Sequence, residues 1–115
     1  MRLLYKAPLT ALLALASFLL VALLWKSVPL LTFLLATIGG LMIVIGDNFL
    51  GDLLLFISCG AMGTLAELLS IHYGAWAYAL PSFAGIPLWL PFLWGTAAVF
   101  MKRTSAAISY ARAKK

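Results

Sequence analysis

The sequence predicts an all-α integral membrane protein, a polytopic bundle of four transmembrane helices in a single domain over residues 1–115. Of its 115 residues, 65% are hydrophobic and 10% are charged, whereas soluble domains are typically about 45–50% apolar and about 25% charged. A soluble domain of this length has too little interior to bury so much apolar surface. The chain also contains four long apolar runs, and a membrane-spanning helix needs about 20 mostly apolar residues.

These runs set the expected helices in order. The four predicted spans are residues 7–25, 28–46, 53–71 and 84–101. Ala14-Leu15-Ala16 resembles a signal-peptidase site, but the apolar run continues to Trp25, so we favour a retained helix over a cleaved signal. Pro29 suits the first turn of the second helix. Pro91 would kink the fourth helix unless it also lies in a first turn.

Small residues mark the expected contacts between helices. The second helix carries Ala36 and Gly40, with Gly39 beside them, and the fourth carries Pro91 and Gly95 four positions apart. Small side chains allow two helix backbones to approach closely in a membrane. We therefore expect packing at these positions rather than a chemical role.

An aromatic segment separates the third and fourth helices. Residues 72–85 contain several Tyr and Trp residues and are broken by Gly74, Pro81 and Gly85. The segment is too short to span a bilayer, and Trp and Tyr favour the headgroup level. It is therefore predicted to lie in the membrane interface or to fold partly back between helices.

The basic residues predict the orientation. With four spans, both termini and the middle joint share one side, which collects Arg2, Lys6, Lys102, Arg103, Arg112, Lys114 and Lys115. The other side has only Lys26. Lys and Arg concentrate in cytoplasmic segments, so both termini are expected in the cytoplasm of a cell with an inner membrane of prokaryotic type. Residues 102–115 then form a basic cytoplasmic tail that contacts anionic lipids.

Charge at chain ends and beside apolar runs argues against nucleic acid as a partner, since nucleic-acid binding gathers charge on one water-facing surface. Membrane lipids are the expected partners, and a homo-oligomer is left open. Nothing in the sequence indicates a cofactor. The single cysteine, Cys59, forms neither an internal disulfide nor a metal site by itself.

Glu67 is the residue most indicative of function. It lies 14 residues beyond Leu53, about 21 Å along a helix, and an ionisable group at that depth must be neutralised, paired or hydrated. At 100° per residue it shares a face with small and polar residues, namely Gly60, Gly63, Thr64 and Ser70. The opposite face carries Leu54, Met62, Leu65 and Leu69. Glu67 should therefore point into the bundle or toward a second copy of the chain.

Two readings of Glu67 stay open. It could be protonated and hydrogen-bonded, joining helices, or it could contact substrate, transfer protons or bind a cation. In the second reading, His72 is its candidate acid–base partner, although five positions do not share a helix face, so the helix would have to unwind near Ile71. Thr64 and Ser70 are candidate substrate-binding residues. One His and one Glu fall short of a metal ligand set.

A second polar group lies in the joint between the second and third helices. Asp47, Asn48 and Asp52 form a polar cytoplasmic loop. Asp52 is expected to cap the third helix, and pairing of the aspartates with Lys102 or Arg103 is the structural interpretation. A carboxylate pair that holds a cation or a headgroup amine is the functional one.

The segment after Glu67 resembles a known family. The pattern consists of Gly74-Ala75-Trp76-Ala77-Tyr78, then Gly85-Ile86-Pro87-Leu88-Trp89, and a following Trp94. It resembles a region of the carotenoid biosynthesis proteins, which are membrane hydratase-like proteins of isoprenoid metabolism. The resemblance covers about residues 67–94, and those proteins are longer. It implies that Glu67 faces a polyisoprenoid or lipid-like substrate and that Trp76, Tyr78 and Trp89 line its entry.

Three functions follow as hypotheses. The first is a protein that handles a lipid or isoprenoid-like substrate at Glu67. The second is a small oligomeric transporter coupled to protons through Glu67, and the third is a structural or accessory membrane subunit. Whether the protein is an enzyme is left open.

Overall fold

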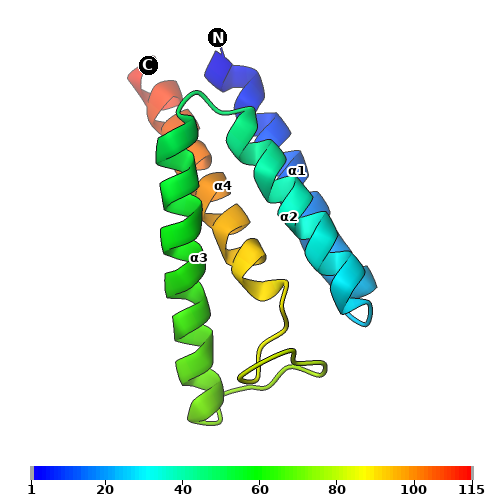
Figure 1. Cartoon of the computed structure of the whole chain (residues 1–115). Coiled ribbons are helices and arrows are strands. Elements are labelled where there is room, and N and C mark those ends of the chain that lie inside the picture. Colours follow the sequence, from blue (N-terminus) through cyan, green and yellow to red (C-terminus); the bar gives the residue numbers. More distant parts are fainter. Residues whose placement is uncertain (1, 115) are drawn as a thin grey trace.

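The computed structural model describes residues 2–114, and side chains from residue 6 onward. Within this range the chain forms four helices and no strand, which confirms the all-α prediction (Figure 1). The helices are α1 (Arg2–Leu24), α2 (Val28–Val44), α3 (Phe49–His72) and α4 (Leu90–Ala113). Lys115 and the side chain of Arg2, which entered the charge count, lie outside the described part.

Helix α4 lies at the centre of the fold. It packs against α1, α2 and α3, whereas α3 touches the α1–α2 pair only through a few contacts with α2. Figure 1 shows α4 between α3 and the α1–α2 pair, with both termini and the α2–α3 joint at one end. We call this the terminal end. The loop 73–89 lies at the opposite end, and a core of Leu31, Leu35, Ile86, Trp89 and Leu90 joins it to α2 and α4.

The predicted rotation of the third helix is confirmed. Gly60 and Gly63 are buried, while the residues of the opposite face, Leu54, Met62, Leu65 and Leu69, are each 50% or more exposed. A Cβ at Gly60 would lie 3.0 Å from the carbonyl oxygen of Pro91 in α4. A Cβ at Gly63 would overlap the ring of Trp94. Because both glycines lack a side chain, α3 and α4 approach closely there.

The contact predicted for the second helix is shifted by one residue. Gly40 faces open space, whereas Gly39 is buried against Phe56 of α3 and Thr96 of α4. The buried stripe of α2 runs through Leu31, Leu35 and Gly39 at a spacing of four, so Ala36 and Gly40 lie beside it. In α4, Gly95 packs against Phe56, and the expected close contact at this position is confirmed.

The boundaries around the α2–α3 joint differ from the predicted ones. Helix α2 ends at Val44, and α3 begins at Phe49 rather than at residue 53. Asn48 is the N-cap, and its side chain accepts a hydrogen bond from the backbone nitrogen of Gly51 at 3.0 Å. The expectation that Asp52 caps the helix is therefore wrong. Asn is as good a capping residue as Asp, so it takes this place and Asp52 lies in the first turn.

The fourth helix begins later and ends later than predicted. Residues 84–89 belong to a loop, since proline has no N–H and disfavours helix at the residue before it. Pro91 falls in the first turn of α4, where it is tolerated. At the other end the helix continues to Ala113, so most of the predicted basic tail is helical. Ala, Lys and Arg are good helix formers.

A tight turn ends the loop. Phe83 and Ile86 exchange two backbone hydrogen bonds, of 3.1 and 2.9 Å, across Ala84 and Gly85. Both central residues have positive φ, 50° at Ala84 and 90° at Gly85, as in a type I′ turn. Glycine adopts this backbone freely, whereas alanine pays a steric cost.

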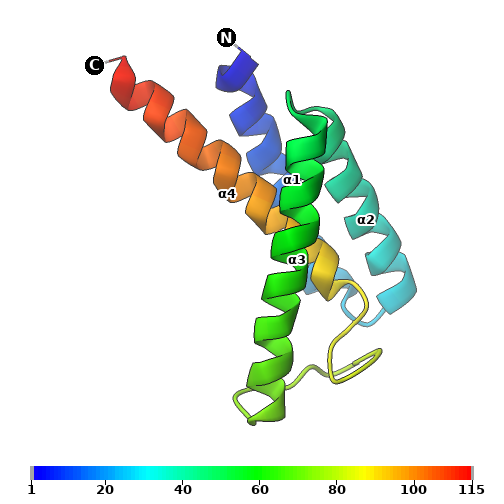
Figure 2. The same cartoon turned by 60° about the vertical axis from the view of Figure 1, so that its left-hand side comes forward.

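Two helices are long and apolar enough to cross a membrane, Lys6–Leu24 in α1 and Phe49–His72 in α3. Helix α2 is also apolar but has 17 residues. Helix α4 meets Lys102 and Arg103 halfway along its length. Figure 2 shows the half that follows these residues diverging from the other helices.

Candidate functional site

The carboxylate of Glu67 is held by two aromatic side chains of the following loop. Trp76 Nε1 donates to Glu67 Oε2 at 2.9 Å, and the Tyr78 hydroxyl donates to the same oxygen at 2.7 Å. Oε1 receives no hydrogen bond from any described residue. The carboxylate therefore has one oxygen fixed by the protein and one available to a ligand.

The chain returns to Glu67 because of the way α3 ends. The helix closes at His72, and Gly74 then takes a φ of 83°, a backbone that suits glycine. The backbone nitrogen of Ala75 donates to Ser70 O at 2.8 Å. This reversal carries Trp76 and the residues after it back along the last turns of α3.

Tyr78 is fixed on two sides. Its hydroxyl meets Glu67, and its ring packs edge-to-face on that of Trp89, with 6.1 Å between the ring centres. Burial, the hydrogen bond to Glu67 and the charge of that carboxylate all raise the pKa of Tyr78 above its ordinary value. Tyr78 therefore stays a neutral hydrogen-bond donor across the physiological pH range.

A small cavity adjoins the carboxylate. Its volume is about 210 Å³, and it lies between α1, α3 and α4. The lining consists of Phe18, Glu67, Tyr78, Leu90, Leu93, Trp94 and Ala97. Apart from the carboxylate, the tyrosine hydroxyl and the indole N–H of Trp94, these side chains offer only hydrocarbon and aromatic surface. A second cavity of about 340 Å³, lined in part by Trp25 and Trp89, lies on another side of Tyr78.

The other predicted site residues are not joined to Glu67. His72 is exposed and packs edge-on against the ring of Tyr73, with 4.9 Å between centres. Helix α3 runs unbroken through His72, so the unwinding needed for an acid–base pair is absent. Ser70 donates to the Ala66 carbonyl at 2.9 Å. The Oγ1 of Thr64 and the Nε1 of Trp89 are buried without a hydrogen-bond partner among the described residues.

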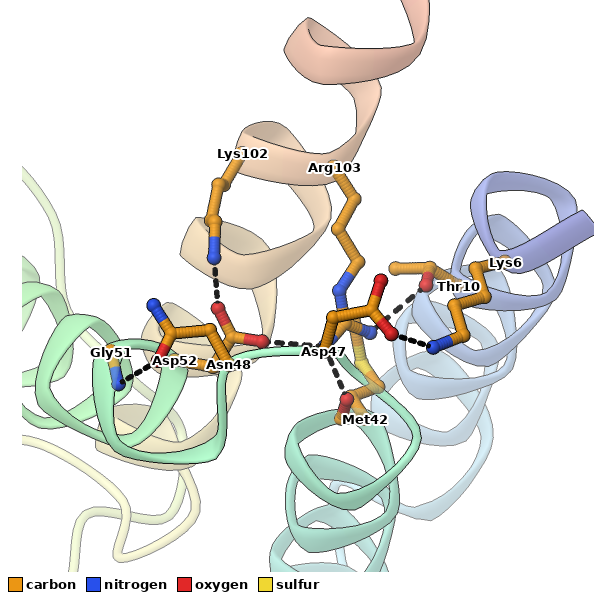
Figure 3. Close-up of polar contacts among 9 residues, drawn as sticks. All are labelled: Lys6, Thr10, Met42, Asp47, Asn48, Gly51, Asp52, Lys102 and Arg103. Atoms are coloured by element: carbon orange, nitrogen blue, oxygen red, sulfur yellow. Dashed lines mark hydrogen bonds and ion pairs between the residues drawn. The ribbon is translucent and has the colours of Figure 1, made fainter. Parts of the chain in front are cut away.

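A second polar cluster lies at the terminal end and joins all four helices (Figure 3). Asp52 is 1% exposed. Its Oδ2 accepts a hydrogen bond from Arg103 Nη2 at 2.9 Å, and its Oδ1 accepts one from the ammonium of Lys102. Arg103 also donates to Thr10 Oγ1 at 3.1 Å and to the backbone carbonyl of Met42. One guanidinium thus connects α4 to α1, α2 and α3.

The pairing of Asp52 with Lys102 and Arg103, one of the interpretations drawn from the sequence, is confirmed. Asp47 accepts a hydrogen bond from the ammonium of Lys6 in α1 and forms an ion pair with it. The burial of Arg103 is not predicted from the sequence, which places this residue in the basic tail. In the structure Arg103 is 7% exposed. A signal existed, because Gly95, Val99 and Arg103 follow one another at a spacing of four and form one buried stripe of α4.

Neither cluster has the composition of a metal site. Within residues 2–114 no three His, Cys, Asp or Glu side chains lie together so as to hold a metal ion. No family model, curated protein or solved structure matches the chain.

Proposed function

We propose that this protein spans the membrane with four helices and binds a lipid or isoprenoid-like amphiphile at Glu67. The observation that carries the proposal is the half-occupied carboxylate: Trp76 and Tyr78 donate to Oε2, no described residue donates to Oε1, and Glu67 lines a mostly apolar cavity. Concave apolar sites with a few fixed polar groups are typical of small-molecule binding.

The topology within this proposal has both termini in the cytoplasm of a prokaryotic-type inner membrane. It is supported by the common position of the termini and the α2–α3 joint at the terminal end (Figure 1) and by the concentration of Lys and Arg there. Large apolar side chains are exposed on three helices, for example Leu23 of α1, Phe33 of α2 and Met62 of α3, at 66–77%. Lipid is the environment in which such exposure is favourable.

The chemistry of the cavity suggests which ligand it takes. A carboxylate oxygen accepts hydrogen bonds, so the ligand should carry a donor such as a hydroxyl at its polar end. The hydrocarbon lining favours a chain or isoprenoid group next to that donor. Trp76 and Tyr78 keep the carboxylate oriented while the ligand binds.

Photolabelling tests the ligand assignment. The probe is a long-chain prenyl alcohol with a diazirine near its hydroxyl, added to the purified protein in detergent. We expect labelling within the cavity, and about tenfold weaker labelling of Glu67→Gln, since a hydrogen bond to a charged group contributes about 1.5–3 kcal/mol. Leu93→Trp should fill the cavity and block labelling, whereas Ala61→Phe on the exposed face of α3 should not.

Two outcomes would count against the proposal. Equal labelling of the wild type and Glu67→Gln would show that the carboxylate does not hold the probe. Equal labelling by the corresponding hydrocarbon without a hydroxyl would show that the probe follows only apolar surface.

Cysteine labelling tests the topology separately. In a Cys59→Ser background, an impermeant thiol reagent added to intact cells should label Ser82→Cys in the loop and spare Ser105→Cys on α4. Both serines are exposed in the structure, so access to the thiol depends on the side of the membrane. The opposite pattern would reverse the orientation.

A further inference from the structure

A groove separate from the Glu67 cavity runs between α3 and α4. Its volume is about 810 Å³. Half of the residues that line it are small, among them Gly51, Cys59 and Gly63 on α3 and Ala98 on α4. Trp94 and Ala97 line both the groove and the Glu67 cavity, and Trp94 lies directly against Gly63.

The groove ends in a positively charged group. Lys102 and Asn48 line it at the terminal end, the level of the residues in Figure 3. Asp52 is shared between Lys102 and Arg103, so two cations and one carboxylate leave this trio with a charge of +1. Arg103 is buried, but the side chain of Lys102 is 45% exposed. Lys102, the more exposed of the two cations, therefore places the net positive charge of this trio at the end of the groove.

Asn48 adds a hydrogen-bond donor to the same place. Its Oδ1 is occupied by the backbone nitrogen of Gly51, while its Nδ2 donates to no residue that the structure describes. An ammonium and an amide N–H₂ that line the same end of an apolar groove favour an anion attached to a hydrocarbon chain.

We propose that the α3–α4 groove binds an anionic phospholipid, with its phosphate at Lys102 and Asn48 and one acyl chain between the two helices. The proposal rests on the membrane placement proposed above and is independent of the Glu67 ligand. The groove is long enough for one acyl chain. From Gly51 to Ala66 its α3 wall rises by 15 residues, about 22 Å of helix, and the hydrocarbon of one leaflet is about 15 Å thick.

A second copy of the chain is the competing occupant. A transmembrane helix in the groove would use the small residues equally well. It would, however, set an apolar surface against the exposed part of Lys102, whose charge a phosphate would complement. The cationic end of the groove therefore favours the lipid.

Native mass spectrometry of the detergent-purified protein tests this proposal. The probes are dioleoyl phosphatidylglycerol and dioleoyl phosphatidylcholine, which share acyl chains and differ in net charge. We expect the wild type to bind the anionic lipid preferentially and Lys102→Gln to bind it about fivefold more weakly, since a basic residue near anionic lipid contributes about 1 kcal/mol. Lys114→Gln removes the same charge from the exposed end of α4 and should retain the wild-type affinity.

A second variant tests the groove itself and does not depend on the charged cluster. Ala98→Phe should reduce binding of both lipids by filling the groove, with Ala61→Phe as its control. Glycerol 3-phosphate should not bind, because the chain supplies the apolar contact. If it binds as tightly as the lipid, the site is a phosphate site and the proposal fails.

Three further results would overturn the assignment. These are equal binding of the two lipids, equal losses in Lys102→Gln and Lys114→Gln, and a lipid-free dimer that Ala98→Phe dissociates. Lipid selectivity with no prenyl-alcohol labelling would refute only the Glu67 proposal. Labelling without lipid selectivity would refute only the groove proposal.

Discussion

Replacing Arg103 by methionine should be the most destabilising single substitution at the terminal end. Methionine keeps a long unbranched side chain but removes the guanidinium. Asp52, which is 1% exposed, would then keep only its bond to Lys102, and the Thr10 hydroxyl and the Met42 carbonyl would lose their donor. The change therefore leaves a buried carboxylate with half of its partners.

The expected loss follows from these contacts. Hydrogen bonds to charged groups contribute about 1.5–3 kcal/mol each, and Arg103 makes such bonds to Asp52 and to the Met42 carbonyl. Removing one partner of a buried ion pair typically costs about 3–5 kcal/mol. Because Lys102 stays on Asp52, we expect the lower end, about 3 kcal/mol of unfolding free energy.

The measurement is reversible unfolding in mixed detergent and denaturant, followed by circular dichroism. A double-mutant cycle with Asp52→Asn should give a coupling energy of about 1 kcal/mol or more, since the two residues are in contact. Arg112→Met on the exposed last turn of α4 is the matched control and should change stability by about 0.5 kcal/mol or less. A loss in Arg103→Met as small as in this control, or zero coupling to Asp52, would refute the reasoning.

Three other predictions concern the loop and the α3–α4 contact. The pKa of Tyr78 is raised in the folded protein. Its neutral form therefore contributes to the stability of the fold at pH values below the ordinary tyrosine pKa, and this contribution is lost as the pH rises through the pKa of Tyr78 in the folded state. Glu67→Gln should lower that pKa, and an unchanged phenolate absorbance titration would contradict this. Gly60→Leu should cost about 1–3 kcal/mol by overpacking against α4, whereas Leu65→Ala on the exposed face should cost less, and equal melting temperatures would contradict the helix rotation. Ala84→Gly should stabilise the turn by up to about 1 kcal/mol, and a lower melting temperature would show that Ala84 does not adopt positive φ.

The sequence was informative where packing follows a regular period. The small face of α3 was identified because Gly60 and Gly63 recur at helical spacing, and both lie against α4. The approach of Trp76 and Tyr78 to Glu67 was expected only through the family resemblance. No periodicity describes how a loop reverses at Gly74, so the two hydrogen bonds to Glu67 could not be derived from spacing.

Whether a charged side chain is buried or exposed was harder to predict, since the same residue type can lie at the surface or form an ion pair in the interior. Arg103 follows Lys102 in a basic segment and was counted as part of the tail, yet the turn of the helix separates the two side chains. Both cations bind Asp52, but the side chain of Lys102 is 45% exposed and that of Arg103 is 8% exposed. The partner was visible in the sequence, but only the packing of α4 determines which of two adjacent cations is buried.

The central position of α4 has a consequence for biogenesis. Helix α4 makes most of the contacts that join α3 to the α1–α2 pair, yet it is synthesised last. A nascent chain that ends before residue 90 therefore lacks the element that holds its halves together. Asp52 precedes Arg103 in synthesis, so under the proposed four-span topology the guanidinium would enter a membrane that already contains its carboxylate partner. We expect α4 to insert poorly when Asp52 is replaced by asparagine, which a glycosylation-site insertion assay would measure, and assembly of the whole bundle to wait for its final helix.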